Sequence, residues 1–341
     1  MATEHYLTKL VDQLWEYRGK HFPDCDYLFD DSYHKPNPPV FTKCHASWNV
    51  LLRPEASREE RTVVWEAIPP SKRQKWFRSM KSSQALAQSV FGNLRARQRM
   101  DLLSQLMGGD GMPLFHRRPS YALETDLEYE VAYLGERSRG RTNLDVLLTQ
   151  GPYRIAVECK LTESEFGRCS RPHLKPGDAS YARDYCNGDY TQQQGREDRC
   201  SLTEIGVGYW KYIPQLFTDW RADVDQSPCP LNETYQLVRN LLAARVRSDG
   251  SVDPAGGHIV VLYDNRNPAF QESGKAGRVY NTVKNALQNP ALLQKTAWQQ
   301  VVACLRHDPE TAWLAEEIGE KYGIVQRMPR GGGGQAPHPT G

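Results

Sequence analysis

The chain has 341 residues and a formal net charge of only +2, because 43 lysine and arginine residues nearly balance 41 aspartate and glutamate residues. This length suffices for one large domain or two ordinary ones, and the near-neutral charge argues against a uniformly basic nucleic-acid-binding surface. The longest apolar run, 259–263, is too short to cross a bilayer, and the first residues lack the apolar stretch of an export signal. We therefore expect a soluble cytoplasmic protein with no membrane partner.

The N-terminal region is predicted to be helical. An amphipathic pattern indicates a helix over 6–17, and a second helix is expected over 58–68. The pattern over 82–107 predicts one or two further helices, with a break near Gly92.

A basic segment lies at 71–100, where eight lysine and arginine residues occur without an acidic one. Such a segment suits contacts with phosphate groups. A solvated helical face is the alternative and the commoner role of a charge run. The candidates for nucleic-acid binding are Lys72, Arg73, Lys75, Arg78 and Lys81.

The first strand is expected at 127–134. Acidic residues alternate with other residues here, so a strand would place them on one face. They are Glu124, Asp126, Glu128 and Glu130. Glu128 and Glu130 fall inside the predicted strand and are the better candidates for an additional metal ligand, but we expect most of the four simply to be exposed.

The next two strands, 143–149 and 153–161, are predicted to form a β-hairpin. Both arms are apolar and β-branched, and Gly151-Pro152 interrupts them where a tight turn is needed. With these two residues as the loop, Gln150 pairs with Tyr153, and the register of the hairpin follows. One face then carries an apolar stripe, in which Leu144 opposes Cys159, Val146 opposes Val157 and Leu148 opposes Ile155.

The other face of the hairpin gathers charged residues. Asp145 lies opposite Glu158 in this register, with Cβ atoms about 5 Å apart, and Lys160 lies two residues beyond Glu158 on the same face. Two like charges in these positions need a nearby cation or a metal ion to offset them. Because Leu147 and Ala156 share this face, we expect a helix to cover it, rather than the solvent that covers an ordinary surface strand pair.

This arrangement resembles the signature of the PD-(D/E)XK nucleases, the restriction-endonuclease-like superfamily. The matching residues are Asp145 and Glu158-Cys159-Lys160, although the proline that usually precedes the first carboxylate is absent. The resemblance implies that Asp145, Glu158 and the backbone carbonyl of Cys159 bind Mg²⁺ or Mn²⁺. It also implies that Lys160 positions or activates the attacking water.

The resemblance extends over about 82–264 and implies a mixed α/β fold, with a restriction-endonuclease-like core whose central mixed β-sheet is flanked by helices. Within this plan, a helix is predicted over 231–247 and a buried strand over 257–263. Further helices are expected over 279–293 and 313–322. We assign the core to 81–265, helical additions to 1–80 and 266–328, and a disordered tail to 329–341.

Gln236 and Arg239 occupy neighbouring positions on one face of the helix predicted over 231–247. Several superfamily members place a glutamine or a cation on the corresponding helix, close to the catalytic face. Gln236 is therefore a further candidate for contact with nucleic acid, and a plain surface position is the alternative.

A cysteine-containing insertion at 167–230 interrupts the core. It has few apolar residues for a core of its own, so a cross-link would stabilise it, and metal is favoured over disulfides in a chain without an export signal. Four thiolates would satisfy either zinc or an iron–sulfur cluster. The spacings of 17, 14 and 29 residues include no Cys-x-x-Cys pair, so buried, unliganded thiols are the alternative. The four residues are Cys169, Cys186, Cys200 and Cys229.

The sequence thus predicts a metal-dependent nuclease that hydrolyses phosphodiester bonds, with DNA as the expected partner by resemblance. A non-catalytic DNA-binding or interaction protein on a nuclease fold is one alternative, and a phosphoesterase acting on RNA is another. Endonuclease and exonuclease action, restriction and repair, and a monomer or a homodimer are all compatible with the sequence.

Overall fold

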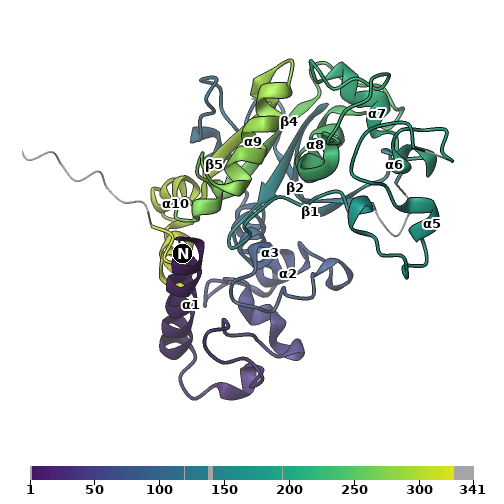
Figure 1. Cartoon of the computed structure of the whole chain (residues 1–341). Coiled ribbons are helices and arrows are strands. Elements are labelled where there is room, and N and C mark those ends of the chain that lie inside the picture. Colours follow the sequence, from purple (N-terminus) through teal and green to yellow (C-terminus); the bar gives the residue numbers. More distant parts are fainter. Residues whose placement is uncertain (1, 119, 137–140, 194, 326–341) are drawn as a thin grey trace, which may run out of the picture.

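One five-stranded mixed β-sheet forms the centre of the protein (Figure 1). The computed structural model describes residues 2–118, 120–136, 141–193 and 195–325. The strands lie in chain order: β1 (Glu124–Val131), β2 (Thr142–Gln150), β3 (Tyr153–Cys159), β4 (Gly257–Tyr263) and β5 (Leu293–Ala297). The first three are antiparallel neighbours, whereas β3, β4 and β5 run parallel. The predicted mixed α/β class is confirmed, and the sheet is consistent with a restriction-endonuclease-like fold.

Helices flank both faces of the sheet. They are α1 (Ala2–His21), α2 (Arg58–Glu66), α3 (Ser83–Ala87), α4 (Asn93–Ala96), α5 (Tyr181–Asp184), α6 (Ser201–Glu204), α7 (Tyr209–Tyr212), α8 (Leu231–Arg245), α9 (Lys275–Ala286), α10 (Trp298–Arg306) and α11 (Ala312–Tyr322). Figure 1 shows α8 and α9 on one side of the strands and α1 to α3 on the other. Within the described ranges, no helix combines the length and the hydropathy needed to cross a membrane.

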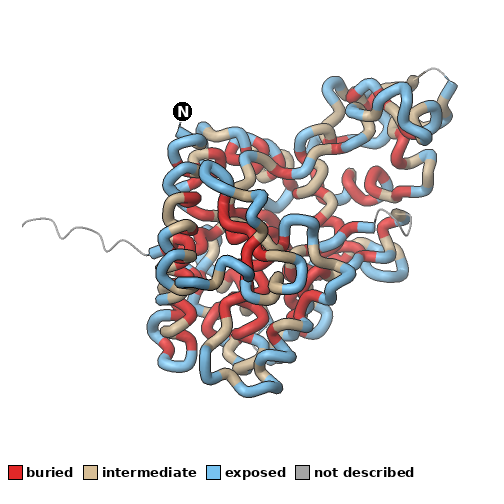
Figure 2. Tube along the Cα trace, turned by 90° about the horizontal axis from the view of Figure 1, so that it is seen from below, coloured by how far each residue is buried: buried red, intermediate tan, exposed pale blue. Residues whose placement is uncertain are grey.

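Two hydrophobic clusters cover the two faces of the sheet. Val157 and Val260 belong to the cluster that includes α1, α10 and α11, whereas Ala156 and Ile259 belong to the cluster built with α8 and α9. Neighbouring residues of β3 and β4 therefore face opposite clusters, as strands covered on both sides require. Full burial of each such aliphatic side chain contributes about 1.5–3 kcal/mol, and the buried residues run through the middle of the molecule (Figure 2).

The predicted register of the β2–β3 hairpin is confirmed from the turn to the Val146–Val157 pair, where the observed pairing ends. Gln150 pairs with Tyr153, and Val146 pairs with Val157. Gly151 in the turn has a φ of 59°, a left-handed conformation that glycine adopts without strain.

The predicted position of Leu144 was wrong. It was expected in the apolar stripe opposite Cys159, but it packs in the cluster of α8 on the other face, while Cys159 lies in the cluster of α1 and α10. The cause is an irregularity next to it: the β1–β2 pairing skips Glu128, whose φ is 50°, so both strands change faces at this point.

The helix break predicted near Gly92 is a change of helix type, not an end of the helical segment. A π-helical turn, Gln88–Gly92, lies between α3 and α4, and a short 3₁₀-helix follows at Met100–Gln105. A Cβ atom on Gly92 would lie 3.2 Å from the Val64 side chain of α2, so the glycine allows a close approach of the two segments.

The C-terminal part of the sheet was not foreseen. The helix predicted over 279–293 ends at Ala286, and β5 and α10 follow instead. Pro290 disfavours the helical conformation of Asn289 and lacks an N–H for the helix, while the Asn289 side chain accepts a hydrogen bond from the Ala291 N–H.

The remaining expected elements were placed within a few residues of their observed bounds. The helices over 6–17, 58–68, 231–247 and 313–322 correspond to α1, α2, α8 and α11, and the first strand lies three residues earlier than expected. The proposed tail lies outside the described residues, and the domain boundaries at 80, 265 and 328 stay predictions.

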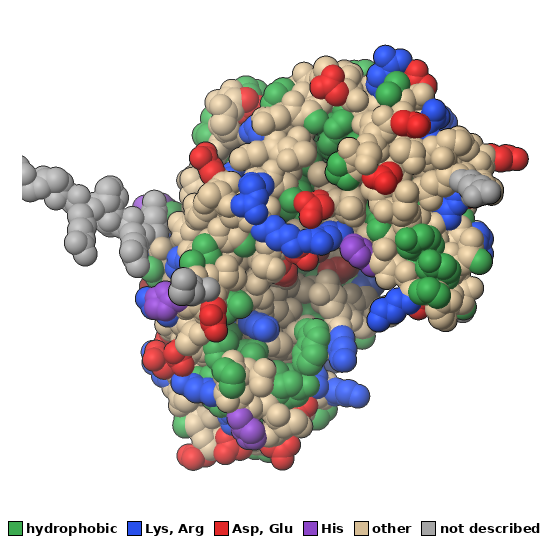
Figure 3. Space-filling view, viewed as in Figure 1, with side chains coloured by type: hydrophobic (Ala, Val, Ile, Leu, Met, Phe, Trp, Pro, Cys, Tyr) green, Lys and Arg blue, Asp and Glu red, His purple; other side chains and the backbone are tan. Residues whose placement is uncertain are grey.

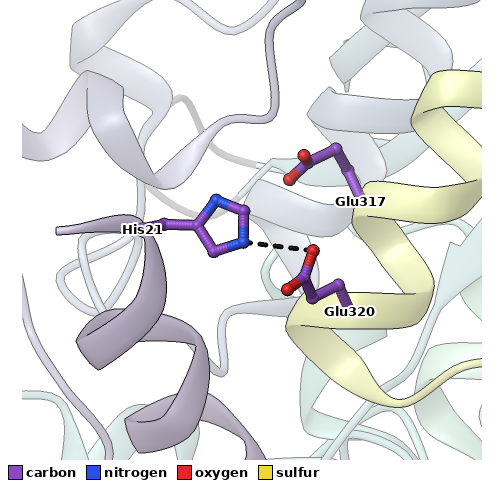
Figure 4. Close-up of side chains that lie close together, drawn as sticks. All are labelled: His21, Glu317 and Glu320. Carbon is purple, nitrogen blue, oxygen red and sulfur yellow. Dashed lines mark ion pairs between the residues drawn. The ribbon is translucent and has the colours of Figure 1, made fainter.

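Helices α1 and α11 join the two ends of the described chain. His21 Nε2 lies 3.1 Å from Glu320 Oε2 (Figure 4). Tyr17 donates a 2.9 Å hydrogen bond to Glu317. Lys321 of α11 is fully buried and donates to the backbone and side-chain oxygens of Asn49, at 2.7 and 2.9 Å. Burial lowers the pKa of Lys321 to about 7.

We predict that Lys321→Met changes how stability depends on pH. The folded pKa of about 7 lies below the unfolded value of 10.5, so the folded chain releases this proton first and stability rises with pH between these values. Relative to the variant, the wild type should gain about 2 kcal/mol of unfolding free energy between pH 7 and 9. Urea unfolding at several pH values measures this difference. The exposed Lys9→Met is the control, and equal pH slopes in wild type and Lys321→Met would contradict the assignment.

Candidate active site

The first carboxylate lies where the ladder between β2 and β3 ends. The last paired residues are Val146 and Val157, and beyond them Asp145 Oδ2 accepts a 2.7 Å hydrogen bond from the backbone N–H of Cys159. Glu158 contacts α8, whereas Cys159 packs into the opposite cluster. The structure therefore gives Glu158 and Cys159 the faces that the register predicts.

Glu158 and Lys160 form a buried ion pair, with 2.9 Å between Lys160 Nζ and Glu158 Oε1. Gln236 of α8 donates to Glu158 Oε1 at 2.7 Å and accepts from Lys160 at 3.1 Å. Asn240, one helical turn further, donates to Glu158 Oε2 at 2.6 Å. Because two side-chain amides complete its hydrogen bonds, this buried pair meets the condition under which such pairs are tolerated.

The backbone of Lys160 is held from two further elements. Its N–H donates to the carbonyl of Leu262 in β4 at 2.7 Å, and its carbonyl accepts a 3.1 Å hydrogen bond from the indole of Trp298 in α10. Trp298 is fully buried. The position of Lys160 therefore depends on the part of the chain that follows β4.

The electrostatic surroundings keep Lys160 charged. Burial disfavours its ammonium form, but the neighbouring carboxylates, Glu158 foremost, outweigh this and raise its pKa. Glu163 is another of these carboxylates, and it accepts hydrogen bonds from Ser83 of α3 and from the Leu161 N–H, both at 2.7 Å.

Glu128 is a third carboxylate at this site. The alternation in β1 predicted that it would share an exposed face with Glu124, Asp126 and Glu130; those three are exposed, but Glu128 is buried. Its left-handed backbone conformation is uncommon for a residue other than glycine and marks the irregularity in β1. The strand was visible in the sequence, whereas the reversal of this one side chain was not.

Contacts from the N-terminal region hold Glu128 in place. Gln84 of α3 donates to its carboxylate, and Lys72 donates to its backbone carbonyl at 2.8 Å. Burial raises the pKa of Glu128 to about 7, and the charge of Glu158 adds to this effect. Burial, Glu158 and Glu128 together raise the pKa of Asp145 well above its usual range. The three carboxylates of Glu128, Asp145 and Glu158 thus lie near one another, and each disfavours the charged form of its neighbours.

The basic segment is largely engaged within the protein. Arg73 stacks 3.3 Å from the Trp65 ring centre, and Arg78 lies 2.7 Å from Asp30. Lys72 binds Glu128, as described above, while Lys75 is exposed and Lys81 partly exposed. The backbone around these five residues forms a 3₁₀ turn followed by further turns, so they do not lie on a solvated helical face.

A hollow on this side of the molecule is bordered by lysine and arginine side chains, with acidic side chains at its floor (Figure 3). Gln236 is not an open contact residue, because both ends of its amide are engaged: besides the contacts above, its Oε1 accepts a 2.7 Å hydrogen bond from the N–H of Gly167. Arg239 lies over the ring of Tyr235 instead.

The four cysteines of the insertion come together away from this site. They line a single small cavity, although they are separated by up to 60 residues, and every cysteine in the described part of the chain is free.

The sequence matches the family described as "Restriction Endonuclease associating with ARP" over residues 34–323. The chain belongs to this restriction endonuclease family. No curated protein and no solved structure matches it. The match covers all five strands, α8 and the insertion. Membership in a restriction endonuclease family supports a nuclease-like function, the hydrolase class and an interaction with DNA.

We predict that Glu128→Gln stabilises this restriction endonuclease family member at neutral and alkaline pH when divalent metal is chelated. The folded pKa of about 7 exceeds the usual 4.5, so the folded state retains the proton longer and loses stability as pH rises between these values. At pH 8 the free energy of unfolding of the variant should exceed that of the wild type by about 2 kcal/mol. This difference should shrink towards pH 5. Denaturant titrations with a chelator measure it. Asp126→Asn, an exposed change in the same strand, is the control, and an equal gain from that variant would refute the role of Glu128.

Proposed function

We propose that the protein is a PD-(D/E)XK nuclease that uses Mg²⁺ or Mn²⁺ to hydrolyse phosphodiester bonds in DNA. The observation that carries this proposal is the meeting of Asp145, Glu158 and Lys160 at the end of the β2–β3 hairpin, with the lysine 2.9 Å from the glutamate. Membership in a restriction endonuclease family supports the nuclease class.

The donor set fits a hard divalent cation. Asp145, Glu158 and the Cys159 carbonyl offer oxygen atoms only, which Mg²⁺ and Mn²⁺ prefer. Burial, together with the neighbouring carboxylates, raises the pKa of Asp145 and Glu128, and a bound cation would favour the charged forms of both groups. When bound, the metal ion would polarise the phosphate and lower the pKa of an attacking water.

Lys160 acts as a cation in this proposal. Its raised pKa and its contact with Glu158 favour the ammonium form, which donates protons in hydrogen bonds and is a poor general base. It therefore aligns the water and stabilises negative charge that develops on the phosphoryl oxygens. Gln236 and Asn240 are positioning residues, because they hold the carboxylate of Glu158 and leave it little freedom to turn.

DNA would approach through the hollow of Figure 3, whose basic border suits a phosphate backbone. Lys75 is exposed, unlike the other four nucleic-acid-binding candidates of the basic segment, and is the strongest of the five for a direct phosphate contact. Phosphate contacts of this kind position a duplex but do not read its sequence.

The proposal predicts that Asp145→Ala and Lys160→Ala abolish DNA cleavage. Supercoiled DNA, linear DNA and RNA are incubated with each protein, with and without Mg²⁺ or Mn²⁺. Cleavage of DNA by the wild type should require the metal, and each substitution should slow it by about a hundredfold or more, because a preorganised charge at the reacting group is lost.

Matched controls are Asp126→Ala and Lys9→Ala, which remove an exposed carboxylate and an exposed cation. Both should cleave like the wild type, and circular dichroism checks that all variants are folded. Intact cleavage by the two active-site variants would show that the site is wrongly assigned. Wild-type binding without cleavage would favour the non-catalytic DNA-binding function, and cleavage restricted to RNA would favour the phosphoesterase.

A second prediction concerns metal binding without substrate. Mg²⁺ or Mn²⁺ should raise the thermal unfolding midpoint of the wild type, because a ligand at a hundredfold excess over its Kd stabilises the folded state by about 2.7 kcal/mol. Asp145→Asn should remove most of this shift while the Asp126→Asn control retains it. An unchanged metal response in Asp145→Asn, measured by differential scanning fluorimetry, would place the metal elsewhere.

A further inference from the structure

The insertion between β3 and α8 brings four thiols to one small cavity, although its chain contains little regular structure. We call this cavity the four-cysteine pocket; its thiols are those of Cys169, Cys186, Cys200 and Cys229. Cys169 and Cys186 lie in irregular segments, Cys200 directly precedes α6, and Cys229 immediately precedes Pro230 and α8. Buried cysteines without a ligand would have no reason to line the same cavity.

Backbone N–H groups are directed at the sulfur atoms. In three of the four cases the donor is the residue two positions further along the chain: Arg171 for Cys169, Leu202 for Cys200 and Leu231 for Cys229. Each of these hydrogen bonds lowers the pKa of its thiol and so favours the thiolate. Hydrogen bonds to sulfur are the means by which proteins support metal-bound thiolates.

One buried polar group that lines the pocket lacks a partner. The hydroxyl of Ser201 has no hydrogen-bond partner within the described structure. The indole of Trp210 lies close enough to Cys200 to lower the pKa of that thiol. Buried polar groups without a partner are uncommon in proteins and indicate a missing one, and sulfide or thiolate sulfur would supply an acceptor for the Ser201 hydroxyl.

The thiols of the pocket are spaced more widely than the ligands of a single zinc ion. Tetrahedral zinc with Zn–S bonds of about 2.3 Å holds its sulfur atoms about 3.8 Å apart. Among the described residues, the only three ligand-bearing groups found within 4.8 Å of one another are those of His21, Glu317 and Glu320 (Figure 4), so no three thiols of the pocket are that close. A cubane cluster separates its four thiolates further, because each of them binds a different iron atom.

We propose that the four-cysteine pocket holds a [4Fe–4S] cluster that fixes the insertion on α8. Each thiol releases its proton when it binds iron, and the positive charge of the iron then compensates the negative charge of each buried thiolate. The cluster lies where the two ends of the insertion meet: the Cys169 N–H donates to Asn232 at 2.9 Å, and the Gln236 N–H donates to Gly167 at 3.0 Å. It therefore secures the helix that positions Glu158.

The test begins with the full chain purified without oxygen and, in parallel, reconstituted with ferrous iron and sulfide. Iron, acid-labile sulfide and zinc are measured, and absorption spectra are recorded. We expect about four iron and four sulfide per chain and a broad band near 400 nm. Trypsin should cut the insertion at least several-fold faster after the cluster is removed by a chelator.

Cys186→Ser and Cys200→Ser should lose the iron and the band. Cys304→Ser is the matched control, because Cys304 is buried to nearly the same extent as Cys186 but lies in α10, outside the pocket. Zinc in place of iron, two disulfides found by mass spectrometry, or a wild type that takes up no cluster on reconstitution would each overturn the proposal. These wild-type measurements decide it even if a serine variant fails to fold.

Discussion

Negative charge confined at one break in the sheet is the constraint on which the rest of the molecule depends. Carboxylates from three adjacent strands, Glu128, Asp145 and Glu158, converge where regular pairing stops. Burial and mutual repulsion raise the pKa of Asp145 and Glu128, so the fold must supply compensating groups. The surrounding helices supply the hydrogen bonds that stabilise these buried charged groups.

That compensation comes from regions far apart in the chain. Helix α8 contributes the amides that hold Glu158, and α3 contributes the amide that holds Glu128. Trp298 of α10 anchors the backbone of Lys160, the one buried cation paired with Glu158. A site assembled in this way is stiff, because each charged group is held by an element that is itself packed on the sheet. This stiffness suits a reaction in which charge develops at one place.

Local rules explain what could be predicted from sequence. A two-residue turn and the alternation of strand residues were sufficient to place Asp145 beside Glu158 and to separate Glu158 from Cys159. Glu128 was named as a candidate for an additional metal ligand, but its burial could not be foreseen, because the contacts that hold it come from Gln84 and Lys72, which are distant in sequence.

The other errors have related causes. Leu144 changes faces at the same irregularity. The edge strand β5 was hidden by an apolar segment that resembles a helix until Pro290 is taken into account. The partners of the basic residues, such as Asp30 for Arg78, could be known only from tertiary contacts. Convergence of the four cysteines likewise depends on turns that their irregular spacing does not encode.

The insertion leaves the sheet after β3 and returns at α8, and its two ends are tied together by hydrogen bonds between Cys169 and Asn232 and between Gly167 and Gln236. An insertion whose two ends are joined in this manner places little constraint on the strands to which it is connected. Its outer loops can lengthen, shorten or change composition while the strands and α8 keep their positions.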